Sequence, residues 1–85
     1  MKGLLNKVLN RPTRRRYLVS TIRQGPEQFE TAVFEAVFFS FPLPWRKPIL
    51  AVKTCTRDEA WDLHHRLASR LAAEYPPRVF QEFTE

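Results

Sequence analysis

The stretch of the sequence that most constrains the fold is residues 56–77, which carry the start, the apolar face and the end of one amphipathic helix. Thr56 and Glu59 have the S/T-x-x-E spacing of a capping box, in which each side chain bonds a free backbone amide of the other residue. Pro76 and Pro77 cannot continue a helix. Apolar residues recur at helical spacing on one side: Ala60, Leu63, Leu67, Leu71 and Tyr75. The pattern predicts one long helix that packs against an apolar surface.

Three segments before this helix have the alternating, β-branched composition of strands, and they cover residues 15–25, 29–41 and 49–55. Gly25-Pro26 separates the first two, and the proline-rich stretch PLPWRKP separates the last two. The middle segment is apolar on both faces, so we expect it to be the central strand. The sequence therefore predicts an α+β fold: a three-stranded antiparallel meander sheet with one long C-terminal helix packed on one face. We expect the tail after the helix to dock as a short strand or to cover part of the core.

The charge of the chain is concentrated at its N-terminus. The formal net charge is +5, and the first 26 residues hold seven of the 14 basic residues and none of the nine acidic ones. We expect residues 1–13 to form a basic amphipathic arm with a short helix, and residues 14–85 to form a single β-β-β-α domain. A one-sided basic segment suggests an anionic partner, which is a nucleic acid, an acidic protein surface or a membrane face.

The two histidines and the one cysteine do not form a pattern typical of a reactive site. His64 and His65 are neighbours on the helix and diverge by about 100°, which is unfavourable for sharing a metal ion. Cys55 lies just before the predicted helix, and His64 lies about two turns along it. This separation is too large for a nucleophile and its general base, which must be in hydrogen-bond contact. We therefore predict no catalytic residue, no metal and no cofactor. We expect His64 to be partly buried, with a bond to a strand backbone or Tyr17, and His65 to lie near Trp61.

A set of basic residues and one tryptophan is the predicted contact surface for a partner. Trp45 lies between prolines and beside two cations, which suits a rigid contact surface, and the alternative is that it folds back on the sheet edge. In an extended strand Arg14 and Arg16 would project together and Arg15 the other way. The predicted partner-binding residues are Lys7, Arg11, Arg14, Arg15, Arg16, Trp45, Arg46 and Lys47.

One face of the central strand stays uncovered if a single helix packs on the other. We expect the N-terminal helix, the tail or a second chain to cover it, so a homo-oligomer is possible. One cysteine excludes an internal disulfide and fits a reducing compartment. No apolar run has the length of a membrane span. These features predict a cytoplasmic location.

The chain resembles small uncharacterised proteins of tailed phages and bacteria that read Y-E-T-x-V-F and, further on, T-x-E-E-A-x-x-x-H. The resemblance covers residues 29–67, and the chain departs from the pattern in its proline-rich stretch and at Leu63, where a glycine is common. The matching residues are Glu30, Thr31, Val33 and Phe34 in the first part and Thr56, Glu59, Ala60 and His64 in the second. The resemblance implies a strand–strand–helix unit of unknown activity, and it marks His64 as the histidine to test.

Together these observations predict a small non-enzymatic basic binding protein. We expect it to be phage-associated and to act as an assembly component or as a binder of a larger protein complex, in the host cytoplasm or the virion. The alternative is a nucleic-acid-binding protein in which the cluster Arg14, Arg15 and Arg16 contacts phosphates.

Overall fold

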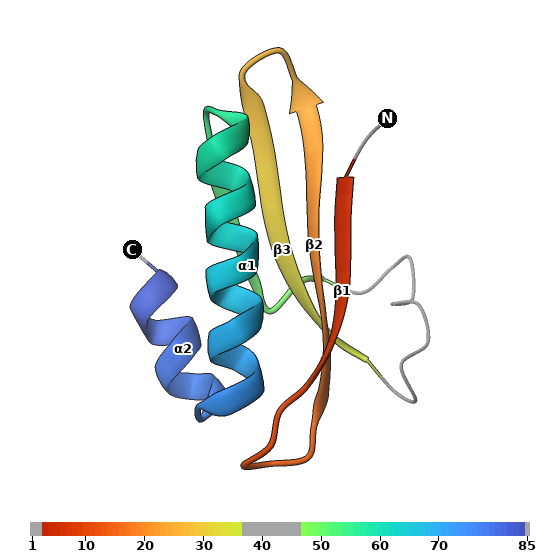
Figure 1. Ribbon diagram of the computed structural model, residues 1–85, viewed down its shortest axis with the longest axis vertical. Helices are drawn as coiled ribbons and strands as arrows, with labels where there is room; N and C mark the ends of the chain where they lie inside the picture. Colours follow the sequence, from red (N-terminus) through yellow and green to blue (C-terminus); the bar gives the residue numbers. More distant parts are fainter. Residues whose placement is uncertain (1–2, 37–46, 85) are drawn as a thin grey trace.

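The computed structural model describes residues 3–36 and 47–84 and shows an antiparallel sheet with helices on one side (Figure 1). The sheet has four strands in the order β1-β2-β3-β4, so each strand pairs with the next one along the chain. The elements are β1 Gly3–Leu9, β2 Arg16–Gly25, β3 Gln28–Ala36, β4 Leu50–Thr54, α1 Arg57–Ala73 and α2 Pro76–Phe83. The α+β class, the antiparallel sheet and a long helix on one face are confirmed, whereas the predicted count of three strands was wrong, and the second described helix follows the long helix instead of preceding the sheet.

The core lies between the helices and one face of the sheet. Val19 on β2 is directly opposite Val33 on β3, and Val33 is opposite Leu50 on β4. These side chains are buried together with Leu67 and Leu71 of α1. Because successive residues of a strand point to opposite faces, the register assigns each strand residue either to this helix-covered face or to the opposite face. The opposite face is called the uncovered face below, because neither α1 nor α2 packs on it within residues 3–36 and 47–84.

Residues 3–9 form strand β1, so the predicted N-terminal helix was wrong. The segment pairs along its whole length with β2, from Gly3 opposite Ile22 to Leu9 opposite Arg16. Strand alternation places Val8 in the core, opposite Tyr17. A helix of about nine residues is marginal by itself, whereas a strand here gains backbone bonds to β2 and a buried side chain.

Helix α1 begins as the sequence predicts. Thr56 is its N-cap, and the reciprocal bonds of the capping box with Glu59 are both present. The helix ends at Ala73, shortly before Pro76, and it buries Leu63, His64, Leu67 and Leu71 against the sheet. The expectation of one long helix in this segment is confirmed.

The tail forms a second helix, α2, rather than a strand. Pro76 and Pro77 occupy its first turn, where a missing backbone N–H costs nothing because those amides have no partner within the helix. The same two prolines that end α1 therefore start α2. Val79 is buried in the core, and Phe80 and Phe83 pack against it, so the alternative expectation that the tail covers part of the core is confirmed.

The predicted strand boundaries agree with the structure within one residue at most ends. The exception is the C-terminal end of the central strand, because β3 is described to Ala36 and residues 37–41 of the predicted strand lie outside the described residues. The position of β3 between β2 and β4 confirms that this segment is an internal strand.

Candidate binding surface

The sheet face opposite the helices carries apolar and basic side chains together. Leu18 and Ala32, near the middle of this uncovered face, are buried. On the edge strand β1, by contrast, Leu5 is 51% exposed and Leu9 is 39% exposed. Lys7 lies between them on the same face and is also exposed. The uncovered face therefore presents apolar surface to solvent at β1, next to a cation.

Two further cations reach the uncovered face from other strands. Arg16 is half-buried at the start of β2, directly opposite Leu9. Lys53 is exposed on β4, opposite Glu30 of β3. Phe34 is half-buried and is the aromatic residue that the described strands place on this face. The face thus combines aliphatic side chains and cations, with little aromatic surface in its described part.

The β1–β2 turn holds three of the predicted arginines, and it does not present them as one row. Arg14 has a positive φ of 64°, so it is not part of an extended strand and the predicted side-by-side projection of Arg14 and Arg16 was wrong. Arg15 forms an ion pair with Glu35 at 3.1 Å. Arg11 and Arg14 are exposed and form no ion pair with any residue in the described ranges. The turn therefore leaves two of its arginines available to an anionic partner.

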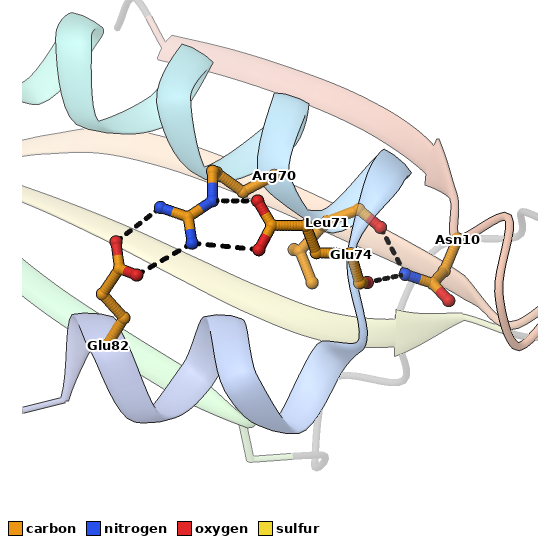
Figure 2. Close-up of polar contacts among 5 residues, drawn as sticks. All are labelled: Asn10, Arg70, Leu71, Glu74 and Glu82. Carbon is orange, nitrogen blue, oxygen red and sulfur yellow. Dashed lines mark hydrogen bonds and ion pairs between the residues drawn. The ribbon is translucent and has the colours of Figure 1, made fainter.

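The same turn closes the C-terminal end of α1 (Figure 2). Asn10 is completely buried, and its side-chain amide donates to the carbonyl oxygens of Leu71 and Glu74, both at 2.6 Å. Its carbonyl oxygen accepts bonds from the amide and the hydroxyl of Thr13. The backbone amide of Arg11 donates to the carbonyl of Ala72 at 3.1 Å. The turn thus satisfies carbonyls that have no partner within the helix.

Arg70 joins α1 to α2 near this end. Figure 2 shows its guanidinium between two carboxylates, Glu74 of α1's C-cap and Glu82 of α2. Hydrogen bonds from Arg70 hold the pKa of the Glu82 carboxyl below its usual range. The bidentate geometry on both sides fixes the orientation of α2 on α1.

His64 is completely buried and belongs to a chain of polar side chains under α1. Its Nε2 lies 2.6 Å from the side-chain oxygen of Asn6 on β1, and its Nδ1 lies 2.8 Å from the hydroxyl of Thr21 on β2. Thr21 in turn contacts the hydroxyl of Thr31 on β3 at 2.7 Å. Because the Asn6 oxygen can only accept, Nε2 donates to it and Nδ1 accepts from Thr21. The expected burial is confirmed, but the expected partners of His64 were wrong.

Burial, with a smaller contribution from His65, lowers the pKa of His64 to about 4. The ring is therefore neutral at pH 7 with both nitrogens engaged, which suits a structural link between three strands and a helix. His65 is exposed and lies edge-on to His64, with ring centroids 5.4 Å apart. Trp61 instead contacts Phe29 and the guanidinium of Arg57.

Cys55 is free and exposed just before α1. Within residues 3–36 and 47–84, no three side chains of the metal-binding types gather into a group that could hold an ion. No helix in these ranges is both long and apolar enough to cross a membrane.

A pocket of about 550 Å³ lies near the turn, between the sheet and the start of α2. Tyr17 and Phe80 form part of its wall and meet edge-on at 5.9 Å, and Tyr75 at its rim is 60% exposed. Burial, and then the charge of Glu35, raise the pKa of the Tyr17 phenol. Tyr17 therefore contributes a neutral phenol, rather than a phenolate, to the wall of the pocket.

The remaining predicted residues lie in or beside the proline-rich stretch. Trp45 and Arg46 lie outside the described residues, so their expected role stays a prediction. Lys47 is exposed at the start of the second described range. No family model, curated protein or solved structure matches this chain.

Sequence reasoning missed two exposed leucines of this surface and the buried Asn10 of the adjoining turn. Leu5 and Leu9 were assigned to a helix face, and only the strand register shows that they share a face with Lys7. Nothing near Asn10 in the sequence indicates its bonds to carbonyls of α1. A strand assignment for residues 3–9 would have found the leucines by simple alternation.

Proposed function

We propose that this protein is a small non-enzymatic binding protein, a component or binder of a larger protein assembly, that contacts an acidic protein partner through its uncovered sheet face. One observation supports the proposal most strongly: Leu5 and Leu9 are exposed on that face with Lys7 between them. An apolar patch with cations beside it fits a partner surface that has apolar residues surrounded by carboxylates. Arg11 and Arg14, in the adjoining turn, add positive charge that accelerates the encounter.

The resemblance to small phage and bacterial proteins supports an origin in a phage-infected or bacterial cell, and the assembly role is part of the proposal itself. A cytoplasmic or virion location belongs to the same proposal. The buried, neutral His64 supports a structural role for the one histidine that the resemblance marks.

The test is the affinity of the natural partner for variants of the uncovered face. The partner is captured from the source cells, purified, and measured against the wild-type chain by surface plasmon resonance. Combined Leu5→Asp and Leu9→Asp should weaken binding at least tenfold, because the new carboxylates would be buried against the partner's apolar residues and beside its carboxylates. Ser69→Asp, at an exposed position on α1, is the matched control and should leave Kd unchanged. A partner that binds the double variant as tightly as the wild type would contradict the proposal.

The second candidate is a nucleic acid bound by the turn arginines, and the exposure of Arg11 and Arg14 favours it. It predicts that a 20-base-pair DNA duplex binds with a steep salt dependence. Combined Arg11→Gln and Arg14→Gln should then lower the slope of log K against log salt by roughly two. The low aromatic content of the described face makes a stacking mode for single strands less suitable. This candidate is ruled out if the affinity for the duplex changes neither with salt concentration nor on substitution of the two arginines.

A further inference from the structure

We propose that the outer edge of β4 is a separate contact surface, which binds an extended segment of a partner protein as a fifth strand of the sheet. The inference concerns a different part of the molecule from the exposed leucines of β1 and does not depend on the function proposed above. β4 is the last strand in the order β1-β2-β3-β4, so among the described strands it pairs with β3 alone. Alternate backbone amides and carbonyls of an edge strand point away from the sheet and are free to bond another strand.

A groove runs along this edge, and a helix forms its other wall. The groove has a volume of about 400 Å³ and is lined by four consecutive residues of β4 and by the end of α2. The lining residues are Leu50, Ala51, Val52, Lys53, Phe83 and Thr84. Figure 1 shows α2 on the same side of the molecule as β4, whereas β1 ends the sheet on the opposite side. A groove between an edge strand and a helix supports strand addition, in which backbone bonds provide affinity and the walls select side chains.

The two sides of β4 differ, and the difference specifies the partner. Leu50 and Val52 point to the helix-covered side, where Leu50 is buried and Val52 packs against the core. Ala51 and Lys53 are exposed on the uncovered side. A fifth strand continues this alternation, so its residues on the helix side would lie near Val52 and Phe83 and should be apolar. Its residues on the other side would lie near Lys53.

The charge of Lys53 indicates that the partner residues on the uncovered side should be acidic. Its ammonium group forms no ion pair with the described part of the chain, although Glu30 is opposite it on β3. Glu30 instead accepts a hydrogen bond from the side chain of Gln24 at 3.1 Å. A carboxylate on the added strand would be the next cross-strand neighbour of Lys53, and opposite charges in that position attract. The structure therefore points to a partner segment that alternates apolar and acidic residues over about the five residues of β4.

The test is an NMR titration of the full-length ¹⁵N-labelled chain with the peptide acetyl-Val-Glu-Val-Glu-Val-amide. The largest amide shifts should occur at Leu50–Lys53 and at Phe83 and Thr84, which line the groove. A peptide of the same composition in the order Val-Val-Val-Glu-Glu should bind at least several-fold more weakly, because it cannot place its side chains alternately. Shifts that are centred on β1, or that spread without a pattern, would overturn the proposal.

N-methylated peptides test the backbone bonds directly. One peptide is methylated at its odd residues and another at its even residues, so that each loses one row of N–H donors. Strand addition predicts that one of the two loses at least tenfold in affinity and the other loses little, because only one row faces β4. Equal effects of the two patterns would show that the peptide does not pair as a strand.

Lys53→Gln tests the charge preference, and Arg78→Gln, at an exposed position in the first turn of α2, is its matched control. Lys53→Gln should weaken the glutamate peptide roughly threefold, as for an exposed ion pair, and leave a Val-Gln-Val-Gln-Val peptide unaffected. Arg78→Gln should change neither affinity. Shifts at β4 that depend on protein concentration without peptide would assign the edge to a second copy of the chain instead. Failure of the peptide to bind would leave the surface around Leu5 and Leu9 untested by this experiment, so the two proposals fail independently.

Discussion

The two ends of α1 are closed in different ways. At the first turn, the amide of Glu59 donates to the hydroxyl of Thr56 at 3.1 Å, and the Glu59 carboxylate accepts from the amide of Thr56 at 3.3 Å. At the last turn, the side chain of Asn10 bonds the carbonyl of Leu71, 61 residues away in the sequence. One end is closed by neighbours in the chain and the other by a turn at the far end of the sequence.

This difference teaches that the stability of a single helix can depend on separate parts of the molecule. The first turn can be capped as soon as the helix forms, because both partners belong to it. The last turn keeps its free carbonyls until the β1–β2 turn docks against it. A helix end that is buried under another element is sensitive to the loss of its partner, because the freed groups cannot reach water.

The largest effect should come from Asn10→Ala, which removes the closure of the last turn. The substitution leaves the buried carbonyl of Leu71 without its side-chain donor and Thr13 without its acceptor. We expect the free energy of unfolding to fall by about 3 kcal/mol, as for more than one buried polar group that loses its partner. Urea denaturation followed by circular dichroism measures this change.

Hydrogen exchange shows whether the effect of Asn10→Ala stays at one end. The amides of the last turn of α1 should exchange faster, relative to the global change, than those that follow Thr56. If exchange increased uniformly along α1, or if the free energy of unfolding fell by less than about 1 kcal/mol, the proposed difference between the two ends of α1 would be contradicted.

An effect of comparable size should be a pH dependence that arises from His64, in the middle of α1. Burial lowers its pKa to about 4 in the folded chain, whereas the pKa of a free histidine is about 6.5. Between these values the unfolded chain binds a proton at His64 and the folded chain does not. The free energy of unfolding should therefore fall as the pH drops from about 7 towards 4, by at most about 1.4 kcal/mol per pH unit from this residue.

Two variants assign this slope to His64. His64→Leu should abolish the slope, although it also lowers stability at pH 7 because Asn6 and Thr21 lose their ring partner. His65→Gln, at the exposed neighbouring position, should keep the slope. Equal slopes in His64→Leu and the wild type would show that another group is responsible.

Thr56→Ala should have a smaller effect, because it removes a cap that is local and exposed. We expect a loss of about 1 kcal/mol in the free energy of unfolding, the usual value for an N-cap threonine. Faster exchange should be confined to the first turn of α1, the reverse of the result for Asn10→Ala. If Thr56→Ala destabilises the protein more than Asn10→Ala does, the expectation that the last turn of α1 contributes more to stability than the first turn is wrong.

The smallest effect should come from Glu82→Gln, which weakens the link between Arg70 and α2. The carboxylate is on the surface, so the loss should be smaller than that of Thr56→Ala and should shrink further in high salt. Glu27→Gln, at another exposed position, is the control. Thermal unfolding at low and high salt measures both variants, and a loss that high salt leaves unchanged would contradict an electrostatic link.

The contrast between the ends of α1 also explains how much the sequence could predict. The capping box, the apolar stripe and strands β2, β3 and β4 are local patterns, and each was located within a residue or so except at the C-terminal end of β3. Leu4, Leu5, Val8 and Leu9 fit a helix face as well as they fit two alternating strand faces. The decision between them depends on β2, which offers its edge to residues 3–9, and no local pattern shows this.

The candidate surface was only partly predictable for the same reason. The sequence identifies cations such as Lys7, Arg11 and Arg14, but their directions depend on register and turn geometry. Arg15, in the β1–β2 turn, forms an ion pair with Glu35 on β3. The order of residues alone does not indicate this pair. Leu5 and Leu9 can be assigned to this surface only from the pairing of β1 with β2.

The closure of α1 by Asn10 has a consequence for the order of events during biosynthesis. The N-terminal hairpin leaves the ribosome first, but the carbonyls that it caps belong to residues synthesised more than 60 positions later. The hairpin alone is too small to be stable and must wait, with its leucines exposed, until α1 is complete. A nascent chain that stalls before Leu71 would therefore hold all four described strands without the end of the helix that covers them, and their core side chains would stay exposed until synthesis resumes.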